Sequence, residues 1–197
     1  MKINCEKIGG LILQLRQEHG LTQQQLADQL GISNKTVSKW ENGKGCPDLA
    51  LWDDLSRILG AELGGMLKGE LTTNRPDVGN LKRTKFFVCP ACGNILTATG
   101  PAELSCCGRR LYPMSPATPG EEHAVRIEES DLEYYVTLDH PMERGHYLRF
   151  AALVQDDRLY LQRLYPEQDA AFRLPTQKRY GSLYICCSQH GLVQYRL

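Results

Sequence analysis

Cysteines in the second half of this chain occur in two pairs whose spacing suits metal binding. Two residues separate Cys89 from Cys92, a spacing that lets both thiolates face one ion. The adjacent residues Cys106 and Cys107 complete a set of four. A glycine that permits a tight turn follows each pair. Four thiolates suit zinc or a single iron, and the spacing alone favours zinc in a purely structural clip. Neighbouring side chains diverge on an extended backbone, so the adjacent pair should distort a tetrahedral site.

Four of the five histidines lie in the same half, in three short segments bounded by glycine or proline. They are His123, the pair His140 and His146, and His190, which follows Cys187 by three residues. A lone histidine in a β-rich domain is most often a surface or core residue without a ligand, but four in this arrangement indicate a second metal site. Imidazoles suit iron, copper or zinc, and a thiolate ligand donates electron density that favours redox chemistry.

The elements that must position these side chains change character along the chain. Residues 5–70 carry apolar side chains at helical spacing. Residues 71–85 have no periodic apolar face and read as a basic linker before short, β-type segments that begin at residue 86. We therefore expect a helical domain at residues 1–70 and a β-rich part from residue 86 onwards. The basic residues of the linker are Arg75, Lys82, Arg83 and Lys85.

Residues 21–49 contain two consecutive helix signals separated by a glycine. Thr22 is placed to cap a helix that runs to about Gln29, Gly31 supplies the turn, and Ser33 caps a second helix that ends near Asn42. Apolar side chains of the second helix would face the core and leave a polar, basic outer face that suits the major groove of DNA. The candidate DNA contacts are Gln23, Ser33, Asn34, Lys35, Thr36, Ser38 and Lys39.

Residues 7–68 resemble the Cro/C1 (XRE-type) helix-turn-helix family through the LTQxxLA, GIS, VSKWENG and PDL segments. The resemblance implies a five-helix domain that binds double-stranded DNA as a homodimer on two-fold sites. A five-helix domain used only for protein contacts is the alternative. Residues 1–70 carry eight basic and nine acidic side chains, so the affinity would have to come from Lys35, Lys39 and Lys44, with the basic linker.

Residues 84–197 resemble desulfoferrodoxin, the two-iron form of superoxide reductase. The matching segments are FFVCPACGNIL, ELSCCG, EEH, HPMERGHYLRF and CCSQHGL, in the order of the family. The resemblance implies a small desulforedoxin-like piece at residues 86–120, followed by an immunoglobulin-like β-sandwich at residues 121–197. The whole chain would then be a multidomain α and β protein. In the family, an iron site with an open sixth position reduces superoxide to peroxide, and a rubredoxin-type donor supplies the electrons.

By this resemblance, two mononuclear iron centres are expected, with zinc as an alternative in the four-cysteine site. The first centre would be held by Cys89, Cys92, Cys106 and Cys107. The second would be held by His123, His140, His146 and His190 in the equatorial plane and by Cys187 as the axial thiolate. Glu121 is a candidate ligand for the sixth position, and Cys186 is expected to be a buried or edge thiol.

One departure from the family concerns the handling of substrate. The family usually has Glu-Lys-His where this chain has Glu-Glu-His, so Glu122 puts a carboxylate at the position of a lysine that is thought to attract superoxide. The one lysine after Lys85 is Lys178. Arg126 or Arg144 could replace the missing cation. Phe150 also stands where the family commonly has tryptophan.

The composition bears on nucleic-acid binding, membrane contact and cellular location. The formal net charge is zero, with 42% hydrophobic and 23% charged residues, so nucleic-acid binding requires a local patch. The first residues lack the apolar core of a signal peptide and the apolar runs are too short to cross a membrane, so we expect a cytoplasmic protein without membrane contact. Cys5 and Cys46 are expected to be ordinary thiols.

Three functions fit these features. The first is a transcriptional regulator whose iron module senses superoxide or redox state. The second is a working superoxide reductase that carries an additional DNA-binding domain. The third is an iron-binding scaffold that retains neither activity.

Overall fold

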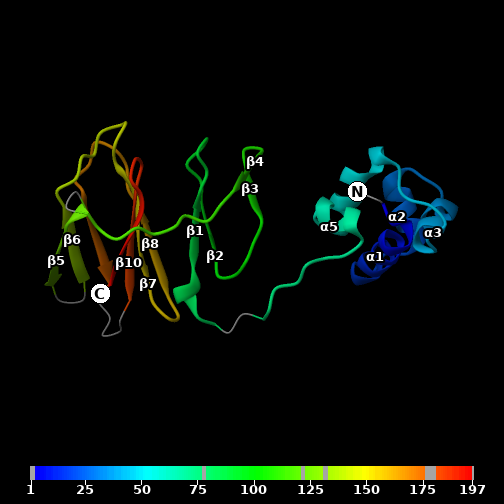
Figure 1. Cartoon of the computed structure of the whole chain (residues 1–197), viewed down its shortest axis with the longest axis horizontal. Helices are drawn as coiled ribbons and strands as arrows, with labels where there is room; N and C mark the ends of the chain where they lie inside the picture. Colours follow the sequence, from blue (N-terminus) through cyan, green and yellow to red (C-terminus); the bar gives the residue numbers. More distant parts are fainter. Residues whose placement is uncertain (1–2, 77–78, 121–122, 131–132, 176–180, 197) are drawn as a thin grey trace. The chain divides into compact units, whose positions relative to one another are not determined.

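The computed structural model describes residues 3–76, 79–120, 123–130, 133–175 and 181–196. The chain divides into two compact units, residues 1–73 and 74–197, shown in Figure 1. Among the described residues, no helix is both long enough and apolar enough to cross a lipid bilayer. The expected boundaries at residues 70, 85 and 120 stay predictions, and the two units are described separately below.

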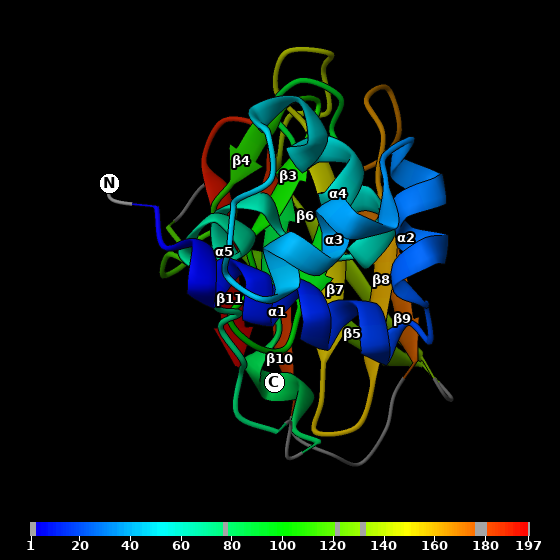
Figure 2. The same ribbon diagram turned by 90° about the vertical axis from the view of Figure 1, so that its right-hand side faces the viewer.

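Unit 1 is helical throughout. Its elements are α1 (Cys5–Glu18), α2 (Gln23–Leu30), α3 (Asn34–Glu41), the 3-10 turn η1 (Leu49–Leu51), α4 (Trp52–Leu59) and α5 (Leu63–Lys68). This confirms the five-helix fold that the periodic apolar residues and the family resemblance predicted. Figure 2 shows α3 lying beside α1, and both α1 and α2 pack against it.

The first helix begins at a polar cap. The cap is Asn4, whose side-chain oxygen accepts hydrogen bonds from the amides of Glu6 and Lys7, both at 3.1 Å. The cap fixes the start of α1 at the residue that follows.

The helix boundaries at the turn between α2 and α3 follow the predicted caps. The Thr22 hydroxyl accepts a hydrogen bond from the Gln25 amide, and the Gln25 side chain accepts one from the Thr22 amide, a reciprocal capping box. The Ser33 hydroxyl accepts from the Thr36 amide at 3.2 Å. Gly31 ends α2 at φ +65°, a left-handed conformation in which a side chain would be strained. These local contacts fix the angle at which α3 leaves α2.

The core of unit 1 brings α1 unusually close to α3. Val37 and Trp40 on α3 are buried with Leu26 and Ala27 on α2, as the apolar pattern predicted. A Cβ atom built on Gly9 in α1 would lie 1.8 Å from the carbonyl oxygen of Trp40. Real Cβ atoms never approach backbone oxygens so closely, so α1 can pack here only because residue 9 has no side chain.

A buried ion pair, which the sequence reasoning missed, ties the end of α3 to α1. The Arg16 Nε atom donates to Glu41 Oε1 at 2.6 Å, and the two side chains are 10% and 3% exposed. The hydrogen bond to Glu41 raises the pKa of Arg16. Arg16 also donates to the Leu21 carbonyl, and Gln23 Nε2 donates to Glu41 Oε2 at 2.7 Å. The Gln23 side chain therefore holds the helices together, and a DNA contact through its backbone amide stays a prediction.

Cys5 and Cys46 correct an expectation. They form a disulfide between residues 41 positions apart, with their Cα atoms separated by 5.0 Å. Cys5 is the first residue of α1, and Cys46 lies in the loop between α3 and η1. The expectation of ordinary thiols was wrong because the packing of α1 on α3 brings together two cysteines that no local pattern connects.

Unit 2 is built from antiparallel strands in four sheets. The strands are β1 (Lys85–Val88), β2 (Ile95–Ala98), β3 (Leu104–Cys106), β4 (Arg109–Leu111), β5 (Val125–Ser130), β6 (Glu133–Leu138), β7 (Leu148–Val154), β8 (Leu159–Arg163), β9 (Ala171–Pro175), β10 (Ser182–Cys187) and β11 (Gly191–Arg196). Strands β1 and β2 form one hairpin, and β3 and β4 another. The larger sheets have the orders β5-β6-β9 and β11-β10-β7-β8, which confirms the predicted β-sandwich.

The four-stranded sheet is the middle layer of unit 2, as Figure 1 shows. One of its faces packs Leu153 and Ile185 against Val136 and Phe172 of the β5-β6-β9 sheet. The other face packs Phe150, Tyr184 and Cys186 against the hairpin of β1, whose Phe86 ring lies 5.4 Å from that of Phe150. Both faces of this sheet are therefore buried, and residues 186 and 187 belong to different cores.

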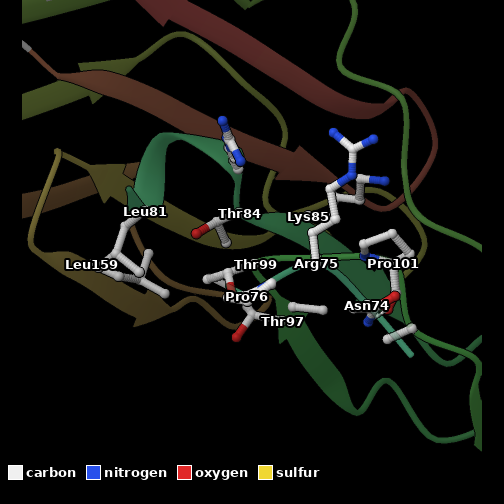
Figure 3. A pocket seen from close by; sticks show the side chains of 14 residues that line it. Asn74, Arg75, Pro76, Leu81, Thr84, Lys85, Thr97, Thr99, Pro101 and Leu159 are labelled. Carbon is white, nitrogen blue, oxygen red and sulfur yellow. Dashed lines mark hydrogen bonds between the residues drawn. The ribbon is translucent and has the colours of Figure 1, made fainter. Parts of the chain in front are cut away.

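Part of the predicted linker packs on unit 2. The 3-10 turn η2 (Leu81–Arg83) is held there because the Leu81 amide donates to the Asp156 carbonyl at 2.9 Å and Lys82 pairs with the Asp156 carboxylate. Arg75, Arg83 and Lys85 line a cavity of about 1220 Å³ beside β2. Figure 3 labels Arg75 and Lys85 among the residues that line this cavity. A contribution of these charges to DNA binding stays a prediction.

Candidate metal centres and DNA-binding face

The first cysteine pair lies in the turn between β1 and β2. The Cys89 amide donates to the Asn94 carbonyl and the Gly93 amide donates to the Cys89 carbonyl, both at 2.9 Å. Gly93 has φ +70°, so the predicted need for glycine in this turn is confirmed. Beneath the turn, Phe87 and Leu111 are buried against Cys89. This packing fixes the base of the cysteine cluster.

The adjacent pair Cys106 and Cys107 converges because of a turn that the sequence reasoning did not consider. Cys106 ends β3 and pairs with Arg109 of β4, which leaves Cys107 and Gly108 as a two-residue hairpin loop. Their φ angles are +51° and +70°, the signature of a type I′ turn. The left-handed backbone aims the Cys107 side chain back towards Cys106, so the expected divergence of neighbouring thiols does not occur.

The four thiols have the spacing of a tetrahedral metal site. Their sulfur atoms all lie within 4.8 Å of one another, with 3.5 Å between Cys92 and Cys106 and 3.9 Å between Cys106 and Cys107. An ion bound at about 2.3 Å would hold tetrahedral sulfurs roughly 3.8 Å apart. Hydrogen bonds from the backbone amide of Cys92 lower the pKa of Cys89 to about 6, whereas contacts with the other thiols, Cys92 first, raise that of Cys107 to about 12. Thiolates at this spacing repel one another, so a bound cation would favour the ionised form of the cluster.

The four histidines of the second predicted site form a closed ring. Neighbouring ring centroids lie 5.1 Å apart for His123 and His140, 4.6 Å for His140 and His146, 4.8 Å for His146 and His190, and 5.0 Å for His190 and His123. Imidazoles bound at about 2.1 Å in a square plane would separate neighbouring ring centres by roughly 4.6 Å. The arrangement therefore fits four imidazoles around one ion.

Cys187 lies against this ring. Its sulfur is 3.6 Å from His190 Nδ1, and the Gln189 backbone amide donates to the sulfur at 3.4 Å. The candidate donor atoms of His123, His140, Cys187 and His190 all lie within 4.8 Å of one another. His146 falls outside that group and joins the cluster through its ring contacts. The structure thus brings together every histidine and the one cysteine predicted for this site, while their role as ligands stays a prediction.

The loops that carry the histidines are held by hydrogen bonds between them. The Ser188 amide donates to the Tyr147 carbonyl at 2.9 Å, and the Tyr147 amide donates to the Ser188 hydroxyl at 3.1 Å. Gln189 Nε2 donates to the Gly145 carbonyl at 3.2 Å. Cys186 and Cys187 are consecutive residues of β10, so their side chains point to opposite faces of the sheet, and the register shift beside them adds one residue to β7, between Leu148 and Phe150. These contacts position the histidine loops around the Cys187 sulfur.

The proton positions of His140 also suit a metal ligand. Its Nδ1 atom lies 2.6 Å from the Pro141 carbonyl oxygen, which can only accept, so Nδ1 carries the proton. Among the described residues, the Nε2 atoms of His140 and His146 are buried without a hydrogen-bond partner. Burial lowers the pKa of His140 and favours the neutral ring. A neutral imidazole with one nitrogen held by a carbonyl and the other facing a cluster is the usual arrangement of a metal-bound histidine.

The residues predicted to handle substrate are only partly described. Glu121, Glu122 and Lys178 lie outside the described residues. Arg144, one candidate for the missing cation, is 85% exposed, and its Nε atom lies 3.0 Å from the Glu167 carboxylate. Arg126 is exposed on β5. Cys186 is buried as expected, and burial raises the pKa of its thiol to about 12.

The outer face of α3 carries the side chains predicted to contact DNA. Lys35 and Lys39 are exposed, while Asn34, Thr36 and Ser38 are half-buried. The Ser33 hydroxyl lies 2.9 Å from that of Thr36 at the start of the helix. The amino-terminal turns of α3 therefore present polar and basic groups on the side opposite Val37 and Trp40. Their contact with DNA stays a prediction.

Comparison with known proteins agrees with this division. The helix-turn-helix family matches residues 12–65. A transcriptional activator of Enterococcus faecalis, BcrR, is 42% identical over 57 residues, which cover 29% of this chain and 28% of that protein. The superoxide reductase of Treponema pallidum has a similar fold, with a TM-score of 0.50 and 19% identity over 57% of this chain and 96% of its own. The chain thus joins an XRE-type DNA-binding domain to a β-unit with the superoxide reductase fold.

The desulfoferrodoxin of Desulfarculus baarsii is 35% identical over 120 residues, which cover 56% of this chain and 94% of that protein. The desulfoferrodoxin homologue of Archaeoglobus fulgidus is 30% identical over 120 residues, which cover 56% of this chain and 94% of that protein. The chain belongs to the desulfoferrodoxin family and carries a helix-turn-helix domain in addition.

Metal analysis of the purified chain is the first test of the two candidate sites. We expect about two iron ions per chain, one with rubredoxin-like visible bands and one with a thiolate-to-ferric band, because one cluster offers four thiolates and the other a thiolate with imidazoles. Zinc in place of iron in both sites would contradict the redox role of both clusters. Zinc in the cysteine site alone would make that site structural.

Proposed function

We propose that the chain is a DNA-binding transcriptional regulator whose iron-binding unit responds to superoxide or redox state. The observation that carries this proposal is the presence of a recognition helix and a ring of four histidines beside Cys187 in one chain. Iron held by these side chains would cycle between ferrous and ferric states. Coupling to DNA requires that unit 2 make different contacts in the two states.

Charge at the second site supports a sensor over an efficient catalyst. Glu122 stands where the family usually has lysine, and a carboxylate repels an anionic substrate. Arg144 is engaged with Glu167, which reduces the positive field it can offer. Slow turnover suits a sensor because its signal needs a change of state and not a high flux.

A working superoxide reductase is the second candidate, because the four imidazoles and the Cys187 thiolate would hold an iron ion that could exchange an electron with superoxide. One superoxide, one electron and two protons would yield one hydrogen peroxide. The buried Nε2 atoms of His140 and His146 would face the ion, and the Gln189 amide would orient the Cys187 sulfur. A rubredoxin-type protein would supply the electrons.

The four-cysteine cluster would hold a second iron, or zinc. It lies in the turns of the first two hairpins of unit 2, β1–β2 and β3–β4. Cys107 supports a metal role for this cluster. A non-glycine residue in a left-handed turn costs about 1 kcal/mol, and binding of an ion by the Cys107 thiol would offset that cost. On DNA we expect a homodimer, because helix-turn-helix domains of this family read two-fold sites.

Footprinting on the promoter of the gene for this chain, with oxidised and reduced iron-loaded protein, tests the regulator. We expect protection of a two-fold site that changes between the two states. We also expect Lys39→Gln to weaken binding and to lower the slope of log affinity against log salt by about 1, because an exposed lysine of α3 would meet a phosphate.

Lys68→Gln is the matched control, since Lys68 is an exposed lysine of the same unit that lies on α5 instead of α3. Its salt slope should equal that of the unsubstituted chain. Equal protection by oxidised and reduced protein would contradict the sensor, and equal slopes for the two variants would contradict α3 as the DNA-reading helix.

A further inference from the structure

The disulfide between Cys5 and Cys46 ties the start of α1 to the loop that follows the recognition helix. The loop is in close contact with α1 even apart from the bond. Gly43, at φ +68°, would bring a Cβ atom within 3.1 Å of the Glu6 Cα atom. With the close approach of Gly9 to Trp40, the end of α3 and its following turn lie directly on the first turns of α1.

The bond is placed where its state can affect DNA contacts. Lys44, one of the basic residues expected to contribute affinity, lies two positions before Cys46 and is exposed. Its amide donates to the carbonyl of Lys39, on α3, at 2.9 Å. The disulfide at Cys46 therefore limits the movement of the segment that contains Lys39 and Lys44, and reduction of the disulfide releases that segment.

We propose that Cys5 and Cys46 form a reversible dithiol–disulfide site that peroxide oxidises, and that the closed form binds DNA more tightly. Both residues are half-buried, so a small oxidant can reach them. A protein that binds chromosomal DNA works in a reducing compartment, where disulfides are mostly catalytic or redox-sensing. The part of this inference that concerns DNA, and the supply of peroxide by unit 2, rest on the proposed function.

The chemistry balances with hydrogen peroxide as the oxidant. The thiolate of one cysteine attacks the O–O bond, which breaks; a sulfur–oxygen bond forms and the leaving hydroxide takes a proton to become water. The second thiol then attacks the sulfenic sulfur, the S–S bond forms, and the second oxygen leaves as water. Two thiols and one peroxide thus yield one disulfide and two waters. A dithiol reductant reopens the bond by exchange.

The direction of the effect follows from preorganisation. Binding to DNA requires α3 and the loop after it to be ordered, and any ordering that the disulfide has already imposed need not be supplied by the contacts with DNA. We therefore expect the oxidised chain to bind more tightly. The oxidant is also the product expected from superoxide reduction, so the site would convert iron chemistry in unit 2 into a lasting change in unit 1.

The experiment uses the full-length, iron-loaded chain, reduced with dithiothreitol and then treated with hydrogen peroxide. Alkylation, tryptic digestion and mass spectrometry follow the two cysteines in separate peptides, residues 3–7 and 45–57. We expect both peptides to be alkylated in the reduced chain and linked in the oxidised one. Affinity for a double-stranded fragment of the chain's own promoter should rise about 5-fold or more on oxidation.

Cys5→Ser and Cys46→Ser should each abolish the difference between the two states, whereas Cys186→Ala should keep it, because that thiol lies in unit 2. Failure of peroxide to link the two peptides, or equal affinity in both states, would overturn the inference. The absence of DNA binding in every state would contradict the proposed regulator, and the peptide result would still decide the redox site. Linkage by added peroxide but not by superoxide would leave the site standing and contradict unit 2 as its source.

Discussion

Cys187→Ser is expected to remove the thiolate-to-ferric absorption band and to lower the rate with superoxide by at least about 100-fold, since loss of even a hydrogen bond to a metal ligand can cost that much. The sulfur of Cys187 lies against the histidine ring and is the soft donor of that cluster. The rubredoxin-like bands of the four-cysteine site should remain. Visible absorption and pulse radiolysis of the reduced, iron-loaded protein measure the two effects.

Cys186→Ala is the matched control for this experiment. Cys186 is the chain neighbour of Cys187 and equally buried, but it faces the core of Phe86 and Tyr184 and not the histidines. Its substitution should leave the band and the rate unchanged. A band that survives in the Cys187 variant would contradict the ligand assignment. A rate of the unsubstituted chain no better than that of free iron would contradict the enzyme and leave the sensor.

Gly9→Ala is expected to lower the free energy of unfolding of unit 1 by about 3 kcal/mol. The new methyl group would meet the Trp40 carbonyl oxygen, a backbone atom that cannot move aside without shifting α3. Thermal and denaturant unfolding, followed by the helical circular dichroism signal, measure the change. DNA binding should fall with it, because α3 carries the recognition face.

Gly10→Ala provides the comparison within the same helix. A Cβ atom at Gly10 meets nothing within 4 Å, and alanine is favoured over glycine inside a helix by up to about 1 kcal/mol. This variant should therefore be slightly more stable than the unsubstituted chain. Similar destabilisation by both substitutions would mean that α1 does not approach α3 as closely as described.

The features that could be predicted from the sequence are those set by local chemistry. The caps at Thr22 and Ser33 and the turn at Gly31 depend on side chains within three residues of the backbone they serve, and all three were predicted. The apolar faces of α2 and α3 follow from helical periodicity in the same way. Such signals do not depend on how distant elements pack.

The features that were missed depend on packing between distant segments. The pair of Arg16 and Glu41 and the disulfide of Cys5 and Cys46 join residues 25 and 41 positions apart, and nothing local marks either pair. The turn at Cys107 is different, because Cys-Gly between two short β-type segments is a recognisable type I′ signal. Attention to that signal would have predicted converging thiols.

The histidine ring lies between these cases. Its members come from three loops, and His140 and His146 share one of them, so only the short segments, and not their convergence, can be read from residue spacing. The resemblance to desulfoferrodoxin supplied the convergence because a family pattern carries the tertiary arrangement of its fold. The orientation of His140, held by the Pro141 carbonyl, became visible only in the structure.

The middle sheet of unit 2 limits how this chain can be shortened. Because its second face is covered by the β1 hairpin, with Phe86 packed on Phe150 and Tyr184, the cysteine-bearing piece shares a core with the sandwich. Removal of that piece would expose the apolar side chains of the middle sheet to water. A truncated form of this chain should therefore keep the hairpin and the sandwich together, as residues 74–197.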